Sequence, residues 1–296
     1  MSGDIDYKAN QGALTALAGN SGTGNITVRN FGGSLTVSSG NINAFGGGVS
    51  LLGTGDVTLT GSVTSNGGAV SINSGGDVSL NAPVSSGGGA VSINSAGSIS
   101  ENYVGTDINS GTGIISLQAG SGIGASSHEI NISSSAPIYA QTTTGDIYLS
   151  SAASMLLGLI SAPGGAAMLV AGSGSIADGN GPAPNISASS ADLYSHGGMG
   201  SVGDPLETHV STLKAENSMS GDIAIDNSGA LTTVDLISSY GGVYITAHSP
   251  LTIGSMGVQS MSNGTIVLTA GASGAGMTGD DLTIKLNGKD LKLTAK

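Results

Sequence analysis

Hydrophobic and small polar residues alternate along most of the chain, and the alternating segments return at a fixed distance. Val49, Val70 and Val91 stand 21 residues apart, and their neighbours keep the same spacing. Each repeat reads Gly-Gly-x-Val-Ser-Ile or a close variant, a turn, Gly-Asp-Val-x-Leu, a second turn and x-Val-Ser-Ser. Alternation with a period of two is typical of a strand with one buried face, and the glycine pairs and Gly-Asp steps indicate turns. The pattern therefore predicts two or three short strands in each repeat.

Strands of three to five residues are too short to form a stable hairpin sheet, so the repeats must be stacked. If each repeat closes one coil, equivalent residues lie above one another about 4.8 Å apart and pair as parallel strands. Three internal stacks follow, made of Val49, Val70 and Val91, of Val57, Val78 and Ile99, and of Val63 and Val84. The predicted fold class is all-β, a right-handed parallel β-helix (β-solenoid) with about 20 to 21 residues per coil.

The same pattern continues beyond Ser100, with longer coils. It is clear in residues 145–149 and 221–225, and no segment shows a sustained period of 3.6 residues, so we expect almost no helix. We interpret residues 1–296 as a single β-solenoid. Regular coils are expected in residues 1–100 and 221–281, and coils with longer surface loops in residues 101–220.

The two ends of the chain differ in pattern. Residues 3–7 already read like the interior residues 145–149, so no N-terminal cap is evident. In residues 282–296 alternation continues on both sides of Asn287-Gly288. This segment is either a hairpin whose lysines shield the last edge, or one more ordinary coil that passes its edge to a neighbour. An open edge predicts self-association end to end, or stacking on adjoining solenoid segments.

Composition restricts the function classes. The chain carries 19 acidic and 7 basic residues, a formal charge of −12, and no Lys or Arg lies between Arg29 and Lys214. Nucleic acid binding requires cations against the phosphates, so we expect no nucleic acid partner for the central body. The longest apolar runs are too short to span a bilayer, and residues 1–10 lack the pattern of a signal peptide. There are no cysteines, and hence no disulfides or cysteine metal sites.

The repeat motifs resemble those of a known family. Gly-Asp-Val-x-Leu, Gly-Gly-x-Val-x-Ile and the stretch Ser-Val-Gly-Asp-Pro-Leu-Glu-Thr at 201–208 look like filamentous-haemagglutinin-like two-partner-secretion exoproteins, which are large bacterial adhesins. The resemblance covers nearly the whole chain. It implies export through a dedicated outer-membrane pore and a long β-helical adhesin or matrix fibre at the cell surface. The Asn-Pro-Asn motifs of the family's export domain are absent, which indicates the shaft repeats.

The resemblance leads to the functional expectation. We predict a structural or adhesive segment of a secreted bacterial cell-surface fibre, which mediates adhesion or the assembly of an extracellular matrix or filament and is not an enzyme. Its partners would be other solenoid segments, and surface glycans or host or sibling cells. The alternative is a carbohydrate-active enzyme, a polysaccharide lyase or hydrolase, on the same scaffold.

Sequence motifs for catalysis are weak. Residues 198–203 and 274–279 match G-x-G-x-x-G, but a dinucleotide site needs a helix directly afterwards, and neither stretch is followed by one. Asp280 and Asp281 faintly resemble the paired aspartates of polygalacturonases. The Gly-His-Gly and Arg-x-Lys elements of those enzymes do not occur. We therefore predict no catalytic residues and no cofactor.

Metal binding is also weakly indicated. Asp56 and Asp77 occupy equivalent positions in successive repeats and could share a calcium ion, but hydrated turn residues are the simpler interpretation. The four histidines, His128, His196, His209 and His248, are far apart in sequence. We predict no metal site. Four Asn-x-Ser/Thr sequons, at Asn25, Asn131, Asn185 and Asn263, are few enough for chance in a chain rich in Asn, Ser and Thr.

Overall fold

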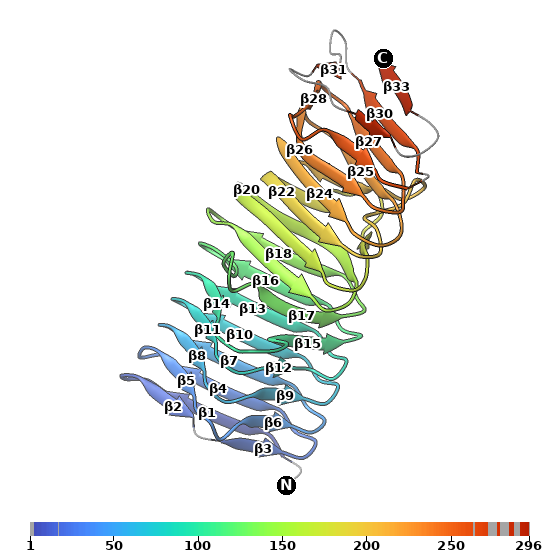
Figure 1. Ribbon diagram of the computed structural model, residues 1–296. Coiled ribbons are helices and arrows are strands. Elements are labelled where there is room, and N and C mark those ends of the chain that lie inside the picture. Colours follow the sequence, from blue (N-terminus) through green and yellow to red (C-terminus); the bar gives the residue numbers. More distant parts are fainter. Residues whose placement is uncertain are drawn as a thin grey trace. The chain divides into compact units, whose positions relative to one another are not determined.

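The computed structural model describes residues 3–16, 18–262, 264–271, 277–278, 284–286 and 291–295. These residues form strands, turns and bends but no helix, and so no helix that could cross a membrane. The chain divides into two compact units, Met1–Leu149 and Ser150–Lys296. Each unit is a parallel β-solenoid with about 21 residues per coil, in which strands of successive coils lie side by side (Figure 1). The predicted fold class is confirmed.

The first unit repeats a long strand and two short strands in each of its early coils. Its strands are β1 (Ile5–Ala9), β2 (Leu14–Ala16), β3 (Gly19–Ser21), β4 (Ile26–Asn30), β5 (Leu35–Val37), β6 (Ile42–Ala44), β7 (Val49–Gly53), β8 (Val57–Leu59), β9 (Val63–Ser65), β10 (Val70–Ser74), β11 (Val78–Leu80), β12 (Val84–Ser85), β13 (Val91–Ser95), β14 (Ile99–Glu101), β15 (Ile108–Gly111), β16 (Ile115–Ala119), β17 (Ile130–Ser134) and β18 (Ile138–Thr142). The strand β19 (Ile147–Ser151) runs across the division between the units.

The predicted internal stacks are present with the predicted partners. Val70 pairs with Val49 on one side and Val91 on the other, each strand bonding in parallel to the strand one coil away. Val78 lies between Val57 and Ile99 in the same way, and Val84 pairs with Val63. Because Val49, Val70 and Val91 are at most 2% exposed, these residues form the core of the coil.

The second unit contains longer strands that continue around the corners of the coil. Its strands are β20 (Met155–Ala171), β21 (Ile176–Asp178), β22 (Ile186–Ser195), β23 (Leu206–His209), β24 (Thr212–Asn217), β25 (Ile223–Asn227), β26 (Leu231–Ser238), β27 (Val243–Ala247), β28 (Leu251–Ile253), β29 (Val258–Ser260), β30 (Ile266–Ala270), β31 (Met277–Thr278), β32 (Ile284–Leu286) and β33 (Leu291–Ala295). The pairing of β20 with β22 shifts register between Ala162 and Ala166, which lets one strand turn the corner.

The strands of the C-terminal segment pair like those of every other coil. β32 pairs in parallel with β29, and β33 pairs in parallel with β30. Residues 287–290, where the hairpin turn was expected, lie outside the described residues.

Side-chain oxygens at the start of a strand connect successive coils. The Asp56 carboxylate accepts the backbone N–H of Asp77 at 3.0 Å, and the Asp77 carboxylate accepts that of Ser98 at 2.7 Å. Each acceptor stands one residue before a strand and reaches the equivalent N–H one coil later. The same contact joins Asp4 to Asn25, Asn25 to Gly48, Asn41 to Ser62, Asp107 to Asn131, Ser154 to Ser175, Asn185 to Glu207 and Asp222 to Gly242.

Buried hydroxyl and amide side chains hydrogen-bond to backbone carbonyls at the corners of the coil. Ser95 lies at the end of β13, is 3% exposed, and donates towards the carbonyls of Gly76 and Ser98 at 2.7 and 3.0 Å. Asn217, at the end of β24, donates to the carbonyls of Ser220 and Gly221. A buried carbonyl without a partner costs stability, so a small polar residue at the inner end of a strand lets the backbone turn without that penalty.

The register of the core predicts opposite effects for two neighbouring substitutions. Val70→Asp buries a charge between Val49 and Val91 and should lower the free energy of unfolding by more than about 3 kcal/mol. Ser71→Asp points outward and should change it by less than about 1 kcal/mol. Chemical denaturation followed by circular dichroism measures both. Equal loss of stability in the two variants would contradict the register.

Candidate functional site

The glycine-rich motif at 198–203 forms a surface hairpin. Met199 is fully buried and bridges in parallel to Ile176 and Ile223, and the chain then turns back through an antiparallel bridge between Ser201 and Asp204. Gly200 has φ +58°, and a Cβ there would lie 2.7 Å from the carbonyl oxygen of Ala224. The glycine is therefore required by the turn and the close packing, and no helix follows it to hold a phosphate.

A second hairpin of the same design lies in the first unit. Ile123 bridges Ile99 and Ile147, and the antiparallel bridge joins Ala125 to His128. Gly124 has φ +68°, and an added Cβ would lie 2.6 Å from the carbonyl oxygen of Tyr148. The other G-x-G-x-x-G match, at 274–279, and the pair Asp280 and Asp281 fall in residues that lie mainly outside the described part of the chain.

The residues considered for metal binding lie in separate structural contacts. Asp56 and Asp77 hold backbone N–H groups of the next coil, as described above. His209 contacts the hydroxyl of Ser228 at 2.9 Å, and His248 contacts the carboxylate of Asp226 at 2.6 Å. Among the described residues no group of three His, Cys, Asp or Glu side chains is arranged to hold a metal ion. Of the sequon asparagines, Asn185 is fully buried.

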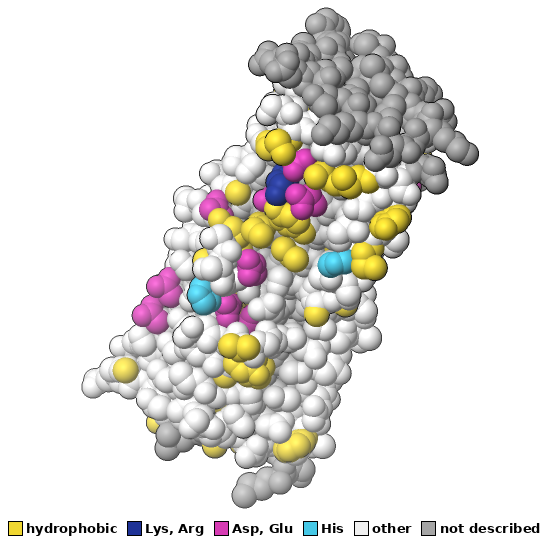
Figure 2. All heavy atoms as spheres, viewed as in Figure 1, with side chains coloured by type: hydrophobic (Ala, Val, Ile, Leu, Met, Phe, Trp, Pro, Cys, Tyr) yellow, Lys and Arg dark blue, Asp and Glu magenta, His cyan; other side chains and the backbone are white. Residues whose placement is uncertain are grey.

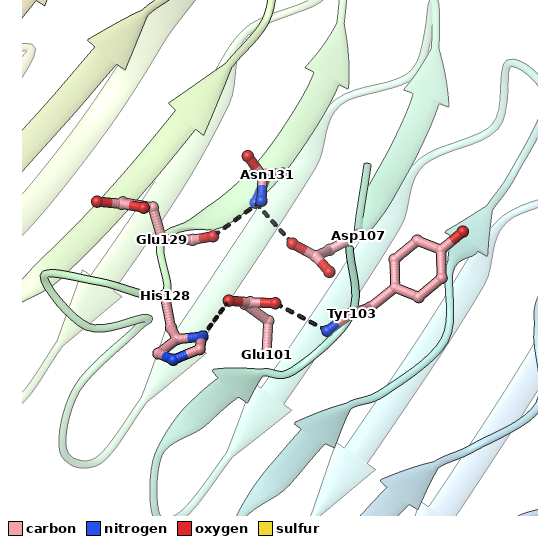
Figure 3. A network of polar contacts seen from close by, with 6 residues as sticks. All are labelled: Glu101, Tyr103, Asp107, His128, Glu129 and Asn131. Atoms are coloured by element: carbon pink, nitrogen blue, oxygen red, sulfur yellow. Dashed lines mark hydrogen bonds and ion pairs between the residues drawn. The ribbon is translucent and has the colours of Figure 1, made fainter. Parts of the chain in front are cut away.

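The structure does assemble a polar network that the sequence did not indicate. Glu101 ends β14, and the chain then crosses the surface to Asp107, directly before β15 (Figure 3). One Glu101 oxygen contacts Nδ1 of His128, in the first unit's hairpin, at 3.0 Å, and the other accepts the backbone N–H of Tyr103 at 2.9 Å. Asp107 accepts the backbone N–H of Asn131 at 2.7 Å. The network thus joins the loop at 102–107 to the next coil.

Burial determines the electrostatics of this network. Asp107 is 0% exposed, and its second oxygen, Oδ1, has no hydrogen-bond partner. The pKa of Asp107 is raised from 3.8 to about 6: burial is the main cause, the hydrogen bond from Asn131 opposes it, and the negative charge of Glu101 adds to it. The Glu101 side chain is only 6% exposed. Both carboxyl groups therefore lie against the protein, where Glu101 accepts a backbone N–H of its own loop and Asp107 accepts one of the next coil.

A second charged cluster lies on one face of the second unit. Asp192, Lys214 and Asp235 are in register on β22, β24 and β26, and Lys214 donates to the hydroxyl of Tyr194 and lies 4.6 Å from its ring centroid. Glu216 is 3.4 Å from Lys214. The tyrosine hydrogen bond and the surrounding carboxylates raise the pKa of Lys214, which favours its cationic form. Burial raises the pKa of Asp192 and Asp235.

Comparisons with known proteins give no identity for the chain. No protein-family model, no curated protein and no solved structure matches it.

The buried carboxyl group predicts a pH dependence of stability. The folded pKa of Asp107 is raised above its ordinary value of 3.8 to about 6, so folding favours the protonated acid. Stability should therefore fall as the pH rises from about 4 to about 6, by at most about 3 kcal/mol. Asp107→Asn keeps an acceptor for Asn131 and should remove this fall, making the protein more stable than the wild type at pH 7.5.

Chemical denaturation between pH 4 and 7.5 measures the effect. Glu129→Gln is the matched control. It neutralises an acidic side chain in the same region and keeps the contact with Asn131, which is made by the backbone carbonyl of Glu129. An Asp107→Asn protein that keeps the wild-type pH dependence would contradict the assignment.

Proposed function

We propose that the chain is a structural or adhesive segment of a secreted bacterial cell-surface fibre of the filamentous-haemagglutinin kind. The observation that supports it most is the stacked coil itself, because strands such as β10 pair in parallel with a strand one coil away on each side. The strands β1, β2 and β3 pair with β4, β5 and β6 of the next coil, and no described strand of the first unit pairs with their other edge.

The side chains of this first coil agree with an edge that another coil covers. Ile5 and Leu14 occupy core positions but are half-buried, whereas Ile26 and Leu35, their partners one coil later, are 1% and 0% exposed. Together with Ala16 and other residues they line an apolar hollow of about 300 Å³. Stacking a further coil on this face would bury the apolar side chains and satisfy the free N–H and C=O groups of three strands at once.

A stack of this kind suits a mechanical role. Within each unit, successive coils bond through backbone ladders, and many of them also through Asp, Asn or Ser side chains that cross between coils. Load is therefore distributed over many parallel hydrogen bonds. The repeat motifs resemble those of filamentous-haemagglutinin-like exoproteins, and this resemblance supports two further parts of the proposal: export through an outer-membrane pore and a location at the cell surface.

The open edge predicts concentration-dependent assembly along the coil axis. Purified protein should form rods that lengthen with concentration, visible by electron microscopy and light scattering. Ile5→Asp should reduce this assembly because it places a charge on the face that docks. Thr27→Asp, one coil further in and pointing outward, is the control and should assemble normally. Two results together would contradict the proposal: protein that stays monomeric at every concentration, and a native polypeptide whose adjoining segments are not solenoid.

A further inference from the structure

Four amide side chains are aligned on the outer surface of the first unit. Asn73 on β10 pairs in register with Asn94 on β13, which pairs with Gln118 on β16, which pairs with Gln141 on β18. Each stands at an outward position of its strand. Because neighbouring parallel strands lie about 4.8 Å apart, the amides form a regular row along the coil axis.

The last three amides of this row line a groove of about 400 Å³. Its floor and walls also include Ser95, Ala96, Ala119, Gly120, Thr142 and Thr143, from the strand ends and corners of the same three coils. Ligand sites are concave, and a few convergent polar groups fix the orientation of the ligand.

These amides are not used by the fold. The side chains of Asn94, Gln118 and Gln141 make no hydrogen bond to any residue that the structure describes. In contrast, the buried Asn217 and Asn227 donate to carbonyls of adjacent turns. The groove amides therefore keep their donors and acceptors for a ligand, and truncating them should cost the fold little.

The charge of the groove selects the class of ligand. None of its lining residues is charged, and the described part of the first unit contains only Lys8 and Arg29 as Lys or Arg side chains, both near its first coils. Figure 2 shows the same tendency on the face in view, where most of the surface is neutral polar side chain and backbone. An anionic polymer would need cations, and a cationic ligand would need carboxylates. An amide both donates and accepts, as a sugar hydroxyl does.

We propose that the row Asn94, Gln118 and Gln141 binds an uncharged polysaccharide chain, laid along the coil axis with its hydroxyl groups paired to successive amides. Neighbouring coils lie about 4.8 Å apart, which is comparable to the length of one sugar unit, so successive units can meet successive amides. This inference specifies the ligand of the adhesive role proposed above and rests on it. Tyr139, two residues before Gln141 on the same outer face of β18, adds an aromatic side chain beside the row.

The test compares the wild type with the double variant Gln118→Met and Gln141→Met, which keeps side-chain length and removes the hydrogen-bonding groups. Asn66→Ala removes an exposed amide outside the groove and is the control. The proteins are applied to an array of immobilised glycans with neutral α- and β-linked chains and anionic chains. Binding constants are then measured for the neutral polymers retained. Thermal unfolding of all three proteins confirms that the fold is kept.

The expected result is binding to at least one neutral glycan, weakened about tenfold or more in the double variant and unchanged in the control. Three results would overturn the inference: no neutral glycan retained, a preference for anionic glycans, or equal binding by the double variant and the wild type. The assay is read at concentrations where the protein does not assemble. A failure of rod formation and a failure of glycan binding are therefore distinguished.

Discussion

The backbone hydrogen bonds between successive coils are the interaction on which everything else in this protein depends. Strands such as β8, β9 and β12 contain only two or three residues and pair solely with strands of neighbouring coils. No coil can satisfy all of its own N–H and C=O groups, so each depends on its neighbours for stability. The thin aliphatic core, the polar corners and the open first edge all follow from this arrangement.

The inner stacks could be predicted from the sequence because they depend on hydrophobic periodicity alone. The stack of Val49, Val70 and Val91 could be predicted from the alternation and the constant spacing alone. The role of Asp56 and Asp77 was missed, since hydropathy treats an aspartate before a strand as a solvated turn residue. The repetition of Gly-Asp-Val at the coil spacing was the available signal, because a carboxylate one coil below an N–H can accept its hydrogen bond.

The polar sites were harder to predict, for a geometric reason. Glu101, Asp107 and His128 meet because a surface loop and a hairpin bring different positions of two coils together, and no fixed spacing marks such insertions. The hairpin at 198–203 likewise resembled a nucleotide-binding motif until the packing of Gly200 explained its glycines. The row Asn94, Gln118 and Gln141 could have been found from the sequence. Finding this row would have required aligning these coils with spacings of 24 and 23 residues in place of the regular 21.

A cross-linking measurement tests the stacking register most directly, because the chain contains no cysteine that would interfere. Ser71 and Ser92 are partners on adjacent coils and both point outward, whereas Asn94 lies two residues further along the same strand. Partners about 4.8 Å apart are within disulfide range, and the diagonal pair, about 8 Å apart, is not. Under mild oxidation, Ser71→Cys with Ser92→Cys should therefore form an intramolecular disulfide without loss of structure, and Ser71→Cys with Asn94→Cys should not. Faster cross-linking of the diagonal pair would contradict the coil register and with it the whole account.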